Sequence, residues 1–147
     1  MVDTSPKPLT HRSATATATL TFPASIVSVL RSSNNSTAKG SVIDVARFAG
    51  IVGSKKTSEL IPLCHQVALS DVDVSVSIAG NQCEVICKAV AVDRTGVEME
   101  AMVGASVAAL SVYDMVKGVS HEVTIGEVKL LEKVGGKRIV KDGKNIT

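Results

Sequence analysis

Alternating apolar and polar positions mark three stretches of the chain as strands. Residues 13–22 alternate Ala with Thr, and residues 72–78 place Val and Ile between Asp and Ser. A two-residue period is typical of a strand with one buried face. Extended character resumes after a Gly-Asn pair at 80–81, so residues 70–92 predict a hairpin. Residues 123–131 predict a fourth strand.

Apolar positions three and four residues apart predict two helices in the first half of the chain. Pro23 stands where helices commonly begin, and residues 25–30 follow it with a short amphipathic pattern. Ser41 with Asp44 resembles a capping box, and helical spacing then continues to Gly53.

A third, longer helix is predicted in the second half. Thr95 and Glu98 form another T-x-x-E pair before an Ala-rich stretch that runs to Gly118. Capping is therefore the favoured role of Glu98. The many small residues of this helix would let it lie close against a sheet or another helix.

The order strand, two helices, two strands, helix, strand matches an α+β, ferredoxin-like fold. In that arrangement an antiparallel sheet carries its helices packed on one face. The fold serves many unrelated functions, so it decides none of them.

The length and composition predict that the 147 residues form a single domain. The polar arm 1–11 and the basic tail 137–147 are expected to be mobile. Aromatic residues make up 2% and the net charge is +2. Those values predict no nucleic-acid partner, because stacking platforms and a strongly basic surface are both missing.

Cys64, Cys83 and Cys87 form an odd set without a CxxC pair, which indicates reduced thiols in an intracellular protein. Cys64 and His65 are adjacent, and no second pair follows at zinc-ligand spacing, so no metal site is predicted. No apolar run approaches the roughly 18 residues of a membrane span, so no membrane partner is expected. We expect a cytoplasmic protein, or an organellar matrix protein if a presequence has been removed.

The candidate chemistry of the long helix centres on Asp114 and Lys117, at positions i and i+3. Alone, such a pair is most often a solvated ion pair. On a helical wheel Glu100 falls about 40° from Asp114, so one flank could present all three groups as an acid/base site.

Two further features have a structural and a functional interpretation. A lone histidine such as His65 is more often a hydrogen-bonded structural residue than a catalyst. The cations are scattered along the chain and would each be surface charges by default. If several of them converge, they suit a polyphosphate.

Three segments closely resemble the cyclic pyranopterin monophosphate synthase family, molybdenum cofactor biosynthesis protein C. They are residues 55–65 (KKTSELIPLCH), 95–101 (TGVEMEA) and 105–117 (ASVAALSVYDMVK), with an opening MVD and a closing GGK that also fit. The resemblance covers nearly the whole chain. The chain departs from the family pattern at Ser41, where an Asp is usual, and at Gln66, where a Pro is usual.

The resemblance implies a lyase without a cofactor. It would convert the 3′,8-cyclised GTP triphosphate derivative to cyclic pyranopterin monophosphate and release pyrophosphate. It also implies a homohexamer, a trimer of dimers, with active sites at subunit interfaces. The catalytic residues carried over are Asp114, Lys117 and Lys39. Substrate contacts would come from Leu63, Cys64, His65, Met99 and Glu100, with Arg12, Glu98 and Lys133 near the pocket.

A different class of function stays open at this point. Ferredoxin-like domains also act as regulatory modules, in which the same cations would hold an anionic small molecule without turnover. Turnover with release of pyrophosphate would distinguish the lyase from the regulatory module.

Overall fold

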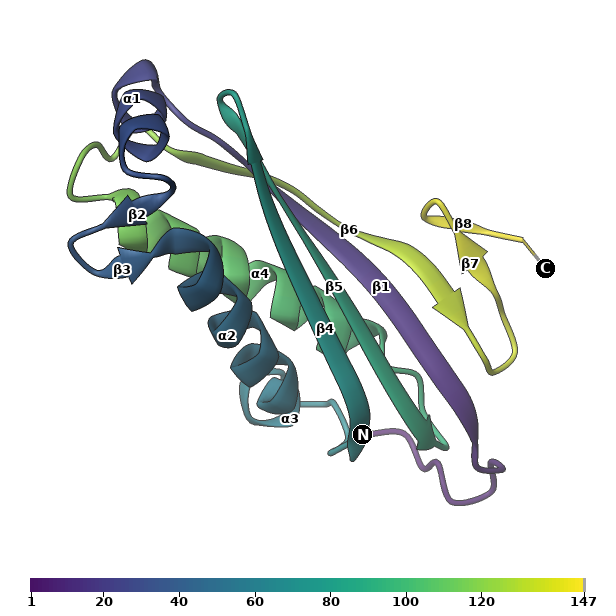
Figure 1. Cartoon of the computed structure of the whole chain (residues 1–147). Coiled ribbons are helices and arrows are strands. Elements are labelled where there is room, and N and C mark those ends of the chain that lie inside the picture. The colour runs from purple at the N-terminus through teal and green to yellow at the C-terminus, as the bar shows by residue number, and fades with distance from the viewer. Residues whose placement is uncertain (147) are drawn as a thin grey trace.

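The computed structural model describes residues 1–146 of the chain (Figure 1). Its long elements alternate as the sequence predicts, with short strands added near residue 40 and in the tail. The helices are α1 (Ala24–Ser32), α2 (Val42–Lys55), α3 (Thr57–Leu60) and α4 (Glu98–Val116). The strands are β1 (Thr10–Thr21), β2 (Ser36–Thr37), β3 (Gly40–Ser41), β4 (Leu69–Ala79), β5 (Gln82–Asp93), β6 (Thr124–Val134), β7 (Val140–Lys141) and β8 (Lys144–Asn145).

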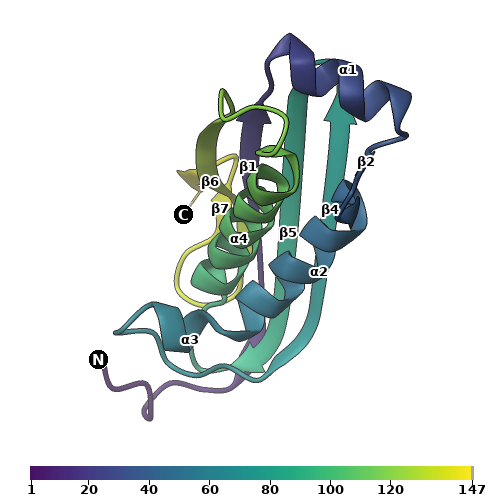
Figure 2. The ribbon, with the colours of Figure 1, turned by 90° about the vertical axis from the view of Figure 1, so that its left-hand side faces the viewer.

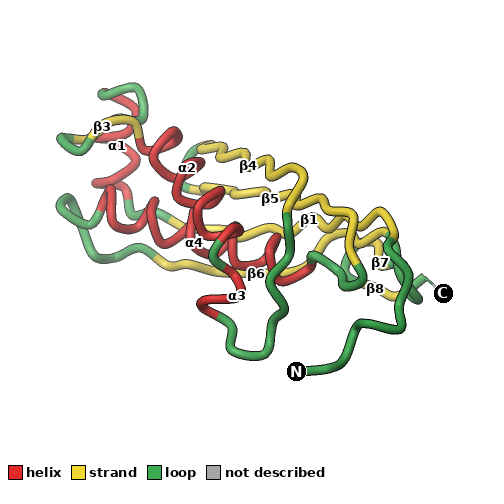
Figure 3. The backbone as a smooth tube through the Cα atoms, turned by 90° about the horizontal axis from the view of Figure 1, so that it is seen from below, coloured by secondary structure: helices red, strands yellow, loops and turns green. Residues whose placement is uncertain are grey.

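One antiparallel sheet carries the fold, with the strand order β4-β5-β1-β6-β7-β8. Its four long strands thus stand in the order second, third, first, fourth, as the ferredoxin-like arrangement requires. Helices α2 and α4 cover one face of this sheet (Figures 2 and 3). The α+β, ferredoxin-like prediction is confirmed.

The core lies between this sheet face and the two helices, and it is built from small and branched side chains. On β1 the alanines at 14, 16 and 18 and Leu20 are buried, while the intervening threonines point to the other face. This is the alternation that the sequence predicts.

Helix α4 is the core helix of the molecule, packed against β1, β5, β6 and α2. Within the described residues it is also the one helix long and apolar enough to cross a membrane by length and composition. The expectation that no apolar run reaches that length is therefore wrong. Since 56% of its apolar window is buried inside the fold, packing in the core accounts for its composition.

One predicted helix cap is confirmed and the other is wrong. The Ser41 Oγ accepts a hydrogen bond of 3.2 Å from the main-chain N–H of Asp44 and caps α2. Helix α4 begins at Glu98 after Val97, with no side-chain cap. Glu98 forms an ion pair with Lys133 of β6, and the main-chain N–H of Thr95 donates instead to Asp93 Oδ1 at 3.3 Å.

The two ends of the chain differ. Residues 1–9 form no helix or strand. Nε of Arg94 donates a hydrogen bond of 2.9 Å to the Lys7 carbonyl and so holds this N-terminal arm against the end of β5. In the tail, expected to be mobile, β7 pairs with β6 and β8 pairs with β7. Residues 140–141 and 144–145 of the tail therefore extend the sheet, and Thr147 lies outside the described residues.

Candidate active site

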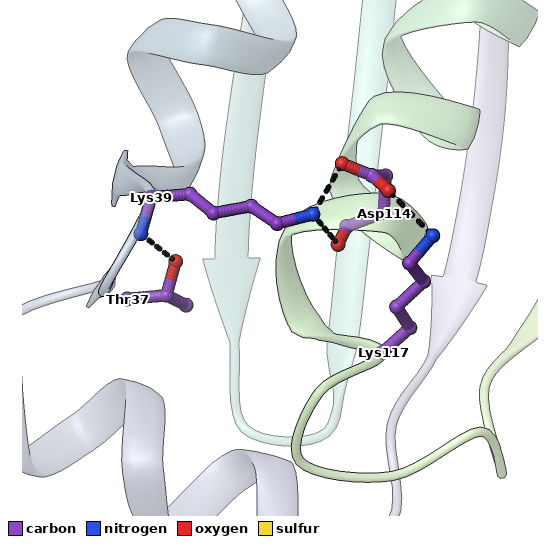
Figure 4. Close-up of polar contacts among 4 residues, drawn as sticks. All are labelled: Thr37, Lys39, Asp114 and Lys117. Atoms are coloured by element: carbon purple, nitrogen blue, oxygen red, sulfur yellow. Dashed lines mark hydrogen bonds and ion pairs between the residues drawn. The ribbon is translucent and has the colours of Figure 1, made fainter.

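The three predicted catalytic side chains meet at the C-terminal end of α4. Asp114 accepts a hydrogen bond at 2.6 Å from Lys39, which lies in the turn between β2 and β3, and pairs at 2.8 Å with Lys117 (Figure 4). Lys39 also donates to the main-chain oxygen of Asp114 at 2.9 Å. The turn is held in place where the Lys39 N–H donates to Thr37 Oγ1 at 3.2 Å. We call these three charged residues the lysine-aspartate cluster.

The charges in this cluster stabilise one another. Hydrogen bonds from Lys117 and Lys39 lower the pKa of Asp114 to about 2, and Asp114 in turn raises the pKa of Lys117. At neutral pH the cluster therefore holds a carboxylate and an ammonium at Lys117. In this state Lys117 can donate a proton or neutralise an anion, but it cannot accept a proton. All three side chains are about half exposed and open to a ligand.

A cavity of about 880 Å³ lies at the other end of α4. Its walls come from the N-terminal arm, the start of β1, the loop 63–67, the start of α4, and the end of β6 with the turn after it. The predicted substrate-contacting residues all line this cavity, although they come from four separate parts of the chain: Arg12, Leu63, Cys64, His65, Glu98, Met99, Glu100 and Lys133.

The cavity has a surplus of positive charge. Six Lys or Arg residues and two Glu residues line it, and one of the glutamates, Glu98, is already paired with Lys133. The scattered cations of the sequence therefore do converge here, and such a lining suits a polyphosphate.

Arg12 is the most deeply buried of these cations, with 7% of its surface exposed. Its Nε donates to the Asp93 carbonyl and its Nη2 donates to the Arg94 carbonyl, each at 3.3 Å. In the described part of the chain no carboxylate forms an ion pair with it. The guanidinium is thus held by main-chain oxygens, with its charge available to an anionic ligand.

Glu100 is the buried acid of the cavity, with 4% of its surface exposed. Burial raises its pKa, and the nearby carboxylates of Glu98 and Asp93 raise it further. A carboxyl group in this setting can hold a proton and transfer it at a pH where an exposed carboxylate is ionised.

The three cysteines differ in location, but the pKa of each thiol is raised. Burial raises the pKa of Cys64, with a contribution from the Glu100 charge, and burial raises the pKa of Cys83 to about 12. Cys83 and Cys87 are buried in the core. All three cysteines are free, and none has the lowered pKa of a nucleophilic cysteine.

The hypothesis that one flank of α4 presents Glu100, Asp114 and Lys117 together is wrong within a single chain. A helical wheel compares angles and discards the position along the axis. At about 1.5 Å per residue, Glu100 and Asp114 lie about 21 Å apart along α4. One chain therefore holds two separate charged groups, the cavity and the lysine-aspartate cluster.

Sequence reasoning missed several residues of the cavity wall. Lys7 and Arg94 line it without having been considered, and Lys137 and Arg138, which the sequence offered only among its scattered cations, line it too. Lys7 and the pair 137–138 lie in segments without hydrophobic periodicity, so no pattern places them against the rest of the fold. Arg94 follows the last residue of β5, and its position at a strand end was the only available signal.

The chain is similar over nearly its whole length to proteins of one family. The model of the MoaC family matches residues 1–136. A cyclic pyranopterin monophosphate synthase of Xanthomonas campestris pv. campestris (strain 8004) is 48% identical over 139 residues, which cover 94% of this chain and 84% of that protein. A protein of the same name from Pelobacter propionicus is 46% identical over 93% of this chain and 86% of its own length. Molybdenum cofactor biosynthesis protein 1 of Drosophila melanogaster is 47% identical over 94% of this chain, which spans 24% of that longer protein.

Proposed function

The chain belongs to the MoaC family, and on that premise we propose that its cavity and its lysine-aspartate cluster are the two halves of a cyclic pyranopterin monophosphate synthase site. The protein is an enzyme of molybdenum cofactor biosynthesis. Its substrate is the 3′,8-cyclised GTP triphosphate derivative, and its products are cyclic pyranopterin monophosphate and pyrophosphate.

The observation that carries this proposal is the convergence of the substrate-contacting residues on one cationic cavity. The volume of about 880 Å³ lies within the range of small-molecule sites, about 300–1,000 Å³. The substrate carries a triphosphate, and the surplus of Lys and Arg in the lining provides the charge to hold it.

The two halves supply different chemistry. In the cavity, which His65 also lines, Glu100 is a proton carrier and Arg12 is a fixed cation. In the lysine-aspartate cluster, Asp114 keeps Lys117 protonated, so Lys117 with Lys39 can neutralise the negative charge that develops as pyrophosphate leaves. Ring opening and closure need such proton transfers, which these residues can provide.

The active assembly in this proposal is a homohexamer, a trimer of dimers, in which the cavity of one chain meets the cluster of another. The separation of about 21 Å along α4 supports it, because one chain does not bring the halves together. Exposed apolar side chains on α2 also support it, with Phe48 at 68% and Val52 at 51% exposure, since surfaces of this kind commonly mark contacts between subunits.

We place this enzyme in the cytoplasm, or in an organellar matrix where a longer precursor is processed. Three free cysteines, two of them buried, support a reducing compartment.

Incubation with the cyclised GTP derivative tests the function directly. We expect pyranopterin and pyrophosphate to appear in equal amounts, and Asp114→Ala or Lys117→Ala to abolish both without unfolding the protein, because these side chains are half exposed. The matched control is Glu127→Ala, which removes an exposed carboxylate from a lysine pair on β6. Binding of the derivative without pyrophosphate release would instead establish the regulatory module.

A further inference from the structure

The two glycines after β6 close over the start of β1. Gly135 and Gly136 have φ values of +96° and +81°, which glycine adopts without strain. A Cβ at Gly136 would overlap Nη1 of Arg12. A Cβ at Gly135 would overlap the main-chain oxygen of His11 and lie 3.0 Å from Cδ of Arg12. This glycine turn, residues 135–136, is therefore one wall of the site that holds Arg12.

The other walls leave one end of the guanidinium free. The carbonyls of Asp93 and Arg94 accept hydrogen bonds from Nε and Nη2 of Arg12. Among residues 1–146 no acceptor takes a hydrogen bond from Nη1, and both Arg12 and Gly136 line the cavity. A buried guanidinium without an anionic partner is costly, and a bound phosphate group would supply that partner.

We propose that the glycine turn is a positioning element for the reaction, which holds Arg12 so that Nη1 donates to the polyphosphate of the ligand. The inference rests on the proposed function, because that function supplies the polyphosphate. It extends the function by assigning Gly136 a role in ligand affinity. Gly136 touches no ligand in this proposal and acts only through Arg12.

The two glycines have different consequences when a methyl group is added. At Gly135 the methyl meets a main-chain oxygen next to the paired strands β1 and β6, so the fold itself must shift. At Gly136 the methyl meets the tip of the Arg12 side chain, whose guanidinium also donates to the carbonyls of residues 93 and 94, so a shift of the tip disturbs these hydrogen bonds. Gly136→Ala is therefore the informative change.

Titration of the intact, assembled protein with inorganic pyrophosphate tests the proposal by calorimetry. We expect Gly136→Ala to weaken pyrophosphate binding at least about tenfold, the usual result of losing a hydrogen bond between charged groups. Gly80→Ala is the matched control, because Gly80 also has a positive φ of +59° but nothing within 4 Å of its added Cβ. The control also places an alanine at a positive φ and should bind as the wild type does.

A double variant separates positioning from general damage. If Gly136 acts through Arg12, adding Gly136→Ala to Arg12→Ala should cause no further loss of affinity. The space left by the shortened side chain would accept the new methyl group. If Gly136→Ala alone fails to fold, recovery of folding in the double variant supports the proposal, and failure of both variants overturns it.

The remaining outcomes are also decisive. Equal binding by Gly136→Ala and Gly80→Ala, additive losses in the double variant, or a wild type that does not bind pyrophosphate would overturn the proposal. A wild type that binds pyrophosphate in a Gly136-dependent way, yet does not turn over the cyclised GTP derivative, would refute only the proposed function.

Discussion

Two carboxyl groups of α4 lie in opposite environments. Asp114 stands among lysines at the exposed end of the helix, and its pKa falls to about 2. Glu100 is buried at the other end, near further carboxylates, and its pKa rises. The same helix thus fixes one group as an anion and leaves the other able to exchange a proton, a difference that favours separate roles.

The burial of Glu100 predicts a pH-dependent cost in stability. Because its pKa in the folded protein lies above the ordinary 4.5, the folded protein holds this proton more tightly than the unfolded chain does. As the pH rises from about 4.5 through the folded pKa, wild-type stability should therefore fall relative to Glu100→Gln, by about 1.4 kcal/mol for each factor of ten in proton affinity. Below that pH range the difference should be constant.

Urea unfolding at fixed protein concentration, at about pH 4 and about pH 8, measures this effect. Glu127→Gln, on the exposed surface of β6, is the control and should change the midpoint little at either pH. A constant difference between Glu100→Gln and the wild type at both pH values would show that Glu100 is not buried as an acid.

At the scale of elements, glycines set the distance between α2 and α4. An added Cβ at Gly104 would overlap Ser54 Oγ and would lie 2.5 Å from Cys87 Sγ and 3.1 Å from the Gly50 carbonyl. On α2, a Cβ at Gly53 would lie 2.8 Å from the side chain of Val107. The two helices therefore lie too close for side chains at these positions.

This contact predicts that Gly104→Ala destabilises the protein by about 1–3 kcal/mol, the usual cost of overfilling a packed core. The overlap outweighs the gain in helix propensity that alanine brings. Gly118→Ala, beyond the end of the same helix and with nothing within 4 Å of its added Cβ, should change stability little. Denaturant unfolding of the two variants measures the difference. Equal stabilities of Gly104→Ala and Gly118→Ala would contradict the close contact between α2 and α4.

The elements were predictable where local patterns determine them. The alternation of residues 72–78 and the cap at Ser41 are local, and both were found where predicted. The cap at Thr95 was wrong: the Thr95 N–H donates to Asp93, and Glu98 pairs with Lys133, far along the chain. The site that holds the Arg12 side chain is formed by β1, the end of β5 and the turn after β6, and no local sequence pattern links those segments. The site residues came from the family resemblance, and their division between two ends of α4 needed the structure.

At the scale of the whole molecule, the division of the site predicts complementation between inactive subunits. His65→Ala removes a residue of the cavity, and Asp114→Asn removes the centre of the lysine-aspartate cluster. If a working site takes its cavity from one chain and its cluster from another, each variant alone should be inactive. Mixed oligomers made by co-expression should regain activity in about a quarter of their sites, by random assortment of subunits at two-fold interfaces.

The control is co-expression of Asp114→Asn with Lys117→Ala, which damages the same half of the site in both chains. No assortment of these subunits restores an intact cluster, so this mixture should stay inactive. Pyrophosphate release by the two mixtures, compared at equal protein concentration, measures the effect. Activity in the first mixture and none in the control is expected, because only the first contains sites with both halves intact. An inactive first mixture that still forms mixed oligomers would mean that each chain completes its own site, by a movement that brings the two ends of α4 to one ligand.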